Sequence, residues 1–354
     1  VYDFALPDQM TCQTAFGFTP AYVFAYHNAS TTEDRRTLID LYFQNLSDHH
    51  ISPYDPAPLD HMKVTWPKVN PDAAVNPETL TPTFDFTAWD RALEEAFNKY
   101  HFNSFMTPMQ GTGGGTFHSR REGSLLGFGV DTPEYKALFT SYCQQLQEHL
   151  REKGWLDKGF IYWFDEPDPD DYEFVTEGFN RMKQAAPDLR RMLTEQPEPE
   201  LYGGPNLWCA ISPEFDIERA AARQALGEEM WWYLCTVPKA PYATLFIDHP
   251  GSEIRVWLWQ TWQRGIDGVL VYATNRWSSP AAYPDRANPQ NPYEDPMAWM
   301  GGYDAKPGDK SPWGNGDGRF IYPPLACADG KPNETVIASM RRLCQVYRSA
   351  WRTQ

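Results

Sequence analysis

The sequence lacks long apolar runs and an excess of positive charge. No apolar segment approaches the ~20 residues that a membrane-spanning helix needs, so we expect a soluble chain without membrane insertion. Lys and Arg number 31 against 47 Asp and Glu, which is a net charge of −16. This negative balance argues against nucleic acid as a partner. The compartment stays open, with secretion and the periplasm among the alternatives.

Paired cysteine motifs are also missing. The six cysteines lie far apart, and none belongs to a C-x-x-C pair or stands at ligand spacing from a histidine. This spacing argues against a zinc site and gives no redox motif. We therefore expect neither a metal nor another cofactor.

Aromatic residues, by contrast, are abundant: the 354 residues include 14 Trp, 19 Tyr and 20 Phe. Their flat, amphipathic rings suit stacking on sugars, although most of them will belong to the core.

One short stretch, residues 159–167, carries the strongest chemical signal. Residues 160–164 form an unbroken apolar and aromatic run, which is typical of a strand buried on both faces. The run ends in Asp165 and Glu166, and Pro167 prevents further ladder pairing. A (β/α)₈ barrel has its catalytic residues at the carboxyl ends of its strands, where these two carboxylates stand. The alternative is that Asp165 only caps the following helix.

Strand-like and helix-like segments alternate along the chain, which predicts an α/β fold, a (β/α)₈ TIM barrel over residues 11–354. A long loop rich in Pro, Asn, Asp and Gly, residues 278–324, follows the eighth strand. The glycine-rich residues 111–116 predict a turn or flexible lid. The expected strands are residues 14–18, 50–55, 102–108, 160–164, 189–194, 206–212, 229–237 and 268–275. The expected helices are residues 32–48, 86–100, 133–153, 171–186, 216–226, 254–264 and 334–351.

The adjacency of the two acids restricts the mechanism. Retaining glycosidases place two carboxyl groups ~5–5.5 Å apart and inverting ones ~6.5–9.5 Å apart, whereas neighbouring strand residues point to opposite faces. The pair suits substrate-assisted hydrolysis, in which a 2-acetamido carbonyl attacks the anomeric carbon. Glu166 would act as general acid and then base, and Asp165 would accept the acetamido N–H and stabilise the positive charge.

The seventh strand supports this interpretation because it ends without an acid. It offers Trp231 and Tyr233, which are two residues apart and so share one face. If that face lines a pocket, Tyr233 can donate to the acetamido oxygen. The alternative is that both side chains pack inside the barrel.

Further candidates stand near strand ends or in loops. Asn275 and Trp277 follow the eighth strand, where a sugar hydroxyl contact and a stacking platform are expected. Trp163 would help to desolvate Glu166 and raise its pKa. Trp259 and His118 are further candidates for sugar contacts, with a helix core position and a surface histidine as the alternatives.

The sequence resembles glycoside hydrolase family 123, which are retaining β-N-acetylgalactosaminidases. The resemblance covers roughly residues 4–324 and depends on the order and spacing of several segments. These are residues 162–167, 231–233, 265–272, 275–277 and 316–323, together with Arg255 and Trp259.

The resemblance implies a TIM barrel, normally behind an N-terminal β-sandwich, with residues 1–10 as the linker from that sandwich. It also implies cleavage of terminal β-linked GalNAc, on a glycolipid or oligosaccharide, through an oxazoline intermediate. The family's aspartate–glutamate pair maps onto Asp165 and Glu166. The preference for GalNAc over GlcNAc follows from the resemblance alone.

Two other functions stay open. A glycosidase acting on sugars without an acetamido group would use Glu166 as acid and Glu195 or Glu214, which also follow strands, as its partner. Either glutamate could instead cap a loop or helix. A non-catalytic barrel that binds glycans through its tryptophans is the third possibility.

Overall fold

The computed structural model describes residues 3, 5, 7–69, 76–116, 119–301 and 305–331. The chain forms two compact units. Unit 1 comprises Val1–Ala15, Tyr54–Tyr233 and Thr261–Leu270, and unit 2 comprises Phe16–Pro53, Leu234–Gln260 and Val271–Gln354. No helix in the described ranges is both long enough and apolar enough to cross a membrane.

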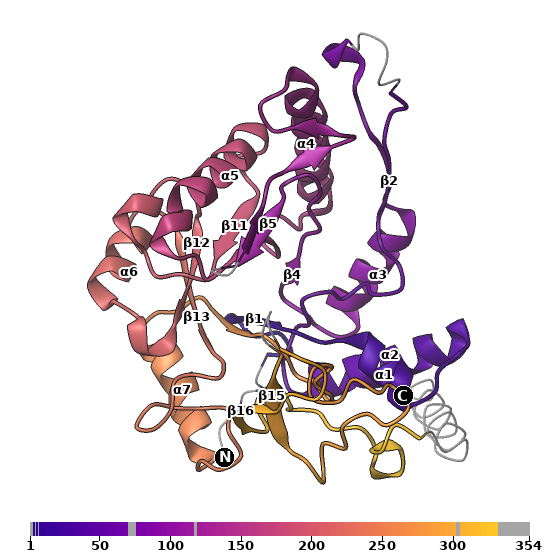
Figure 1. The fold of residues 1–354 in the computed structure, drawn as a ribbon. Coiled ribbons are helices and arrows are strands. Elements are labelled where there is room, and N and C mark those ends of the chain that lie inside the picture. The colour runs from indigo at the N-terminus through magenta and orange to yellow at the C-terminus, as the bar shows by residue number, and fades with distance from the viewer. Residues whose placement is uncertain are drawn as a thin grey trace. The chain divides into compact units, whose positions relative to one another are not determined.

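A seven-stranded, nearly closed barrel sheet organises unit 1, and its order is β1-β14-β13-β12-β11-β9-β4 (Figure 1). The neighbours β4–β9, β9–β11, β11–β12 and β12–β13 pair in parallel. Its strands are β1 (Gln13–Phe16), β4 (Phe105–Met106), β9 (Gly159–Tyr162), β11 (Arg190–Leu193), β12 (Leu207–Ile211), β13 (Glu229–Leu234) and β14 (Gly268–Val271). Because parallel strands end at the same edge, their carboxyl ends bring distant residues together.

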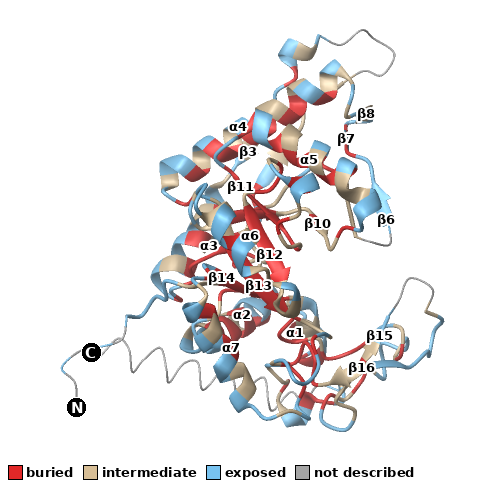
Figure 2. Cartoon of the chain, turned by 90° about the vertical axis from the view of Figure 1, so that its left-hand side faces the viewer, coloured by how far each residue is buried: buried red, intermediate tan, exposed pale blue. Residues whose placement is uncertain are grey.

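The helices of unit 1 follow the strands and cover their outward side chains. They are α3 (Thr87–Asn98), α4 (Pro133–Lys153), α5 (Tyr172–Ala185) and α6 (Ile217–Gln224). The α4 helix begins after Thr132, whose hydroxyl accepts from Tyr135 N, and ends at Gly154, whose φ of 69° suits a C-terminal cap. Outward residues such as Ile161 and Trp208 join these helices in one buried cluster. Figure 2 shows the central strands β11, β12 and β13 coloured as buried.

Several short strands extend unit 1 outside the main sheet. A hairpin is formed by β2 (Lys63–Thr65) and β3 (Thr83–Asp85), and another by β7 (Ser124–Leu125) and β8 (Phe128–Gly129). A three-stranded sheet has the order β10 (Phe164–Asp165), β5 (Gly114–Thr116) and β6 (Ser119–Arg121). This small sheet contains the second half of the aromatic stretch and so carries Asp165.

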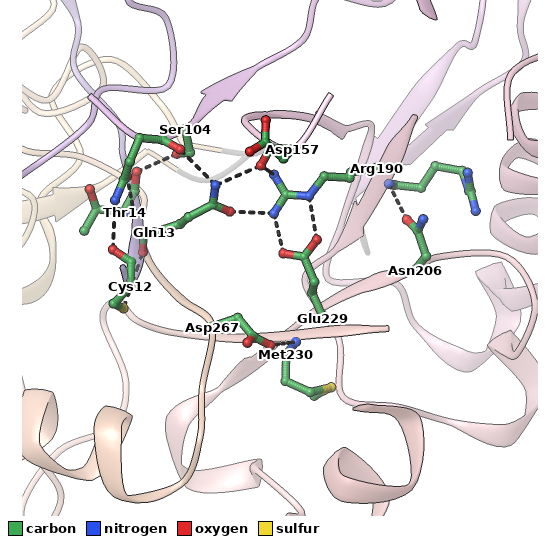
Figure 3. A network of polar contacts seen from close by, with 12 residues as sticks. Cys12, Gln13, Thr14, Ser104, Asp157, Arg190, Asn206, Glu229, Met230 and Asp267 are labelled. Carbon is green, nitrogen blue, oxygen red and sulfur yellow. Dashed lines mark hydrogen bonds and ion pairs between the residues drawn. The ribbon is translucent and has the colours of Figure 1, made fainter. Parts of the chain in front are cut away.

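A polar network spans the inside of the main sheet at the amino ends of its strands (Figure 3). Arg190 is 7% exposed, and its guanidinium forms an ion pair with Glu229, with Nε donating to Oε1 at 2.7 Å. It also donates to Gln13 Oε1 at 2.6 Å and to Asp157 O at 2.8 Å. The network connects β1, β11 and β13, at the edge opposite to the acid pair.

Unit 2 contains α1 (Pro20–Tyr26), α2 (Thr32–Asp48) and the antiparallel pair β15 (Met297–Met300) and β16 (Ser311–Asn315). Helix α7 (Ser252–Gln263) begins in unit 2 and ends in unit 1. The core of unit 2 gathers Val23, Tyr26, Leu38 and Tyr42 around Trp277.

The structure bears out the α/β class and corrects several expected elements. The strand expected at residues 50–55 is only an isolated bridge between Phe16 and Pro53, because proline has no N–H to give to a ladder. The expected lid at residues 111–116 includes strand β5, and the expected loop at residues 278–324 includes β15 and β16. The helix expected at residues 334–351 lies outside the described residues.

Candidate active site

The aromatic stretch does not run as one strand, and its interruption sets the direction of the acids. Strand β9 ends at Tyr162, and β10 leaves the main sheet to pair in parallel with β5, with Asp165 opposite Thr116. Both Trp163 and Phe164 contact Phe174 of α5, with ring centroids 5.6 and 6.0 Å apart. Two successive rings therefore face the helix layer, and the usual alternation shifts by one residue.

The next two residues, the acids, both turn toward side chains of the main sheet. The backbone achieves this at Glu166, whose φ of 46° lies in the left-handed region that few residues other than glycine adopt. Its N–H donates to Thr194 Oγ1 at 2.9 Å, and its carboxylate accepts from the Tyr233 hydroxyl. The expectation that adjacent acids must face opposite sides is therefore wrong at this position.

Asp165 is held by two donors on the same carboxylate oxygen. The Tyr162 hydroxyl donates to Oδ1, and Thr194 Oγ1 donates to it at 3.0 Å. The other oxygen of Asp165, and likewise the second oxygen of Glu166, has no hydrogen-bond partner within the described ranges. Each acid thus has one oxygen fixed by the protein and one available for a ligand.

Burial decides the electrostatics of this site. It raises the pKa of Glu166, an effect to which the negative charges of Asp165 and Glu214 add and which the Tyr233 hydrogen bond opposes. A raised pKa is what a carboxyl group needs to act as a general acid. Burial, together with the charge of Asp165, also raises the pKa of Tyr162 well above its ordinary value, so this phenol stays a proton donor.

Glu195 stands next to this pair at the end of β11. Its pKa is raised to about 7, chiefly by burial. The N–H of Gln196 opposes the shift, and the charges of Glu214, Glu198 and Glu166 add to it. The segments that follow the neighbouring strands β9, β11 and β12 thus bring Glu166, Glu195 and Glu214 to one edge of the main sheet.

Two predicted tryptophans in unit 1 are packing residues. Trp231 is 0% exposed and lies against Phe160, with ring centroids 5.5 Å apart. A Cβ on Gly268 would meet its ring at 2.2 Å, so the Gly268 backbone packs closely on this ring. Trp163 faces α5, where a Cβ on Gly178 would meet its ring at 2.0 Å. Close packing occupies the Trp231 ring, so the substrate contact predicted for Trp231 is wrong for this conformation. The Trp163 ring lies against α5, and its predicted effect on the pKa of Glu166 stays a prediction.

Two predicted residues in unit 2 are also structural. The Asn275 amide accepts from Thr19 N at 2.8 Å and donates to Thr19 O at 2.9 Å, which uses its side chain on the backbone. Trp277 is 0% exposed, packs 5.1 Å from the Tyr26 ring and donates to a backbone carbonyl. Neither side chain is open to a sugar, so these two predictions are corrected. Trp259 is 73% exposed on α7, and His118 lies outside the described residues.

Sequence reasoning missed three hydroxyl groups near the acids. Thr194 and Tyr162 bond Asp165 directly, and both come from strand ends where such residues could have been sought. Tyr54 is the third: its ring lies 6.3 Å from that of Tyr162, and its buried hydroxyl has no partner within the described ranges. Among the residues that the structure describes, no group of three His, Cys, Asp or Glu side chains is arranged to hold a metal ion.

A parallel barrel sheet that presents carboxylates at the carboxyl ends of its strands has the architecture of a barrel glycosidase. The comparison with protein families agrees. The chain belongs to the glycoside hydrolase 123 family, whose catalytic domain matches residues 81–339.

One solved structure has a similar fold: a family 123 glycoside hydrolase from Clostridium perfringens described for glycolipid glycan hydrolysis, with 16% identity and a TM-score of 0.53. The match covers 91% of this chain and 55% of that one, so this chain spans about half of that structure's length. A family 5 mannosidase from Rhizomucor miehei matches at 11% identity with a TM-score of 0.38, covering 96% and 94% of the two chains. A comparison with curated proteins found no match.

Proposed function

We propose that the protein is a retaining exo-β-N-acetylgalactosaminidase that uses the acetamido group of its substrate as the nucleophile. The observation that carries this proposal is the pair Asp165 and Glu166, adjacent in sequence and turned toward the same sheet interior, each with one free oxygen. Family membership supports a glycan substrate. The choice of terminal β-linked GalNAc, on a glycolipid or oligosaccharide, follows the family resemblance.

In the first step, the Glu166 carboxyl group gives its proton to the glycosidic oxygen as the bond from that oxygen to the anomeric carbon breaks. The acetamido carbonyl oxygen forms a new bond to the same carbon, which closes an oxazolinium ring. Asp165, oriented by Tyr162 and Thr194, accepts the acetamido N–H through its free oxygen and stabilises the positive charge.

In the second step, the Glu166 carboxylate takes a proton from water. The water oxygen bonds to the anomeric carbon, and the ring opens to regenerate the acetamido group. Two inversions give net retention of configuration. Tyr233 would orient the acetamido oxygen, which requires its hydroxyl to exchange Glu166 for the substrate.

Substitution of each acid tests these roles. Glu166→Gln should lose nearly all turnover of an aryl β-GalNAc, because no proton donor remains. Asp165→Asn should lower kcat by ~10²–10⁴, in line with a lost charge-stabilising group. Glu173→Gln, an exposed position on α5, is the matched control and should keep wild-type activity.

Substrate choice separates the mechanisms. The enzyme should cleave aryl β-GalNAc and leave aryl β-galactoside intact, because the latter has no acetamido nucleophile, and a thiazoline mimic of the intermediate should inhibit. Comparison with aryl β-GlcNAc determines the sugar preference. Equal hydrolysis of the 2-acetamido and 2-hydroxy glycosides would refute the acetamido mechanism.

The raised pKa of Glu195 supports a second candidate function, a glycosidase in which Glu166 and Glu195, or Glu214, act as the two carboxylates. In that case Glu195→Gln or Glu214→Gln would abolish turnover as fully as Glu166→Gln. Under the acetamido mechanism both variants keep most of their activity. Glycan binding without hydrolysis of any aryl glycoside would instead indicate a carbohydrate-binding barrel.

A further inference from the structure

We propose that Thr194 is a positioning residue that holds the two acids in their working arrangement, an inference that rests on the proposed function of that pair. Thr194 directly follows strand β11 and is 2% exposed. A threonine hydroxyl has one proton to donate and two lone pairs that accept. Here the proton goes to Asp165 Oδ1 at 3.0 Å, and a lone pair accepts the N–H of Glu166 at 2.9 Å.

One hydroxyl group therefore contacts both acids, but at different parts of each. It fixes the side chain of Asp165 and the backbone of Glu166. The Tyr162 hydroxyl, which also donates to Asp165, lies 3.5 Å from the same Thr194 oxygen. The direction in which each acid points thus depends on a residue that would not touch the reacting atoms itself.

The backbone of Glu166 makes this contact consequential. With φ at 46°, the residue occupies a conformation that a side chain disfavours, and such a conformation persists only where surrounding contacts impose it. The bond from Glu166 N to Thr194 is the contact that the structure provides at that peptide. Without it, we expect the backbone to relax and the Glu166 carboxylate to move away from Tyr233.

The experiment compares Thr194→Val, which keeps the side-chain shape without the hydroxyl, with Thr194→Ser, which keeps the hydroxyl. Thr107→Val is the matched control. Thr107 follows strand β4, is 3% exposed, and its hydroxyl has no hydrogen-bond partner within the described ranges. None of the three variants replaces a titratable group that faces Glu166. These groups are Asp165, Glu195, Glu214 and the Tyr233 hydroxyl.

Two measurements follow each protein: kcat and KM for aryl β-GalNAc across pH, and ¹³C NMR titration of the Glu166 carboxyl group. We expect Thr194→Val to lower kcat ~10–100-fold with KM changed less than ~3-fold, because misplaced groups slow chemistry more than binding. The titration midpoint of Glu166 should move by ~0.5 pH or more. Thr194→Ser should restore both quantities, and Thr107→Val should change neither.

A Thr194→Val enzyme whose kcat and Glu166 titration match those of Thr107→Val would overturn the proposal. A Thr194→Ser enzyme as impaired as Thr194→Val would do so too, because the hydroxyl would then be irrelevant. If the wild type cleaves no aryl glycoside, the proposed function fails. The NMR titration, which needs no substrate, still decides whether Thr194 positions the acids.

Discussion

Burial changes the chemistry of individual carboxyl groups at this sheet edge. For Glu195, the ordinary pKa of 4.5 rises to about 7, so the folded protein binds this proton more tightly than the unfolded chain does. The stabilisation that this tighter proton binding gives the folded protein is fully present below the pKa that Glu195 has in the unfolded chain. It is lost as pH rises from about 4.5 to about 7, where the folded protein must carry a buried charge. This residue thus makes the protein more stable toward acid and less stable toward base.

Glu195→Gln removes that ionisation and should raise the melting temperature by about 2–5 °C at pH 8, with little gain at pH 4. Thermal unfolding followed by circular dichroism at pH 4, 6 and 8 measures the effect. The exposed Glu173→Gln provides the baseline and should give no pH-dependent difference. An equal rise in melting temperature for Glu195→Gln at pH 4 and at pH 8 would contradict the raised pKa of Glu195.

Among the secondary-structure elements, the strands of the main sheet are joined from inside at their amino ends. Arg190 of β11 bonds Glu229 of β13 and Gln13 of β1, so one guanidinium bridges strands that are not neighbours (Figure 3). In this ion pair the Arg190 side chain is 8% exposed and the Glu229 side chain is 34% exposed, so the arginine is shielded from solvent and the glutamate is partly open to it. Loss of the glutamate leaves a buried positive charge without its partner.

Glu229→Ala should therefore destabilise the protein by about 2–3 kcal/mol, somewhat less than for a fully buried pair. Urea unfolding gives the value. Glu95→Ala breaks the exposed ion pair between Glu95 of α3 and Lys99, which follows the helix, and should cost less than about 0.5 kcal/mol. Turnover per folded molecule should not change for Glu229→Ala, because Asp165 and Glu166 lie at the opposite ends of the strands. A loss of kcat without a matching loss of stability would refute the independence of the Arg190 network and the acid pair.

At the scale of the whole molecule, the net charge of −16 acts on any substrate that approaches. Like charges repel over about one Debye length, which shrinks from ~30 Å at 0.01 M salt to ~8 Å at 0.15 M. A neutral terminal sugar is unaffected by this field. An anionic sugar must overcome it before reaching the site.

A sulfated aryl β-GalNAc should accordingly show a lower kcat/KM than the neutral compound at 0.01 M salt. The ratio of the neutral to the sulfated kcat/KM should fall several-fold at 0.15 M. Initial rates of both substrates across a sodium chloride series test this, with the neutral substrate as internal control. A ratio that stays constant with salt would show that steric exclusion, and not long-range charge, discriminates against the sulfate.

The sequence predicted the α/β class because apolar periodicity is a local property that neighbouring residues determine together. It also located Asp165 and Glu166 at a strand end. It overcounted the strands at residues 50–55, where Pro53 interrupts pairing, and it missed helix α1. Burial of Trp231 and Trp277 could not be predicted, since strand and loop patterns do not say which large ring fills which space.

The identity of the acid pair and the barrel type of fold were determined by the chain itself, through an apolar run that ends in two carboxylates. The shape of the site was decided only in three dimensions. Thr194 and Tyr233 stand 28 and 67 residues beyond Glu166 along the chain, yet they bond it directly. The contacts between Trp163, Phe164 and α5 shift the strand alternation. Such contacts depend on packing between distant segments, which no local sequence pattern encodes.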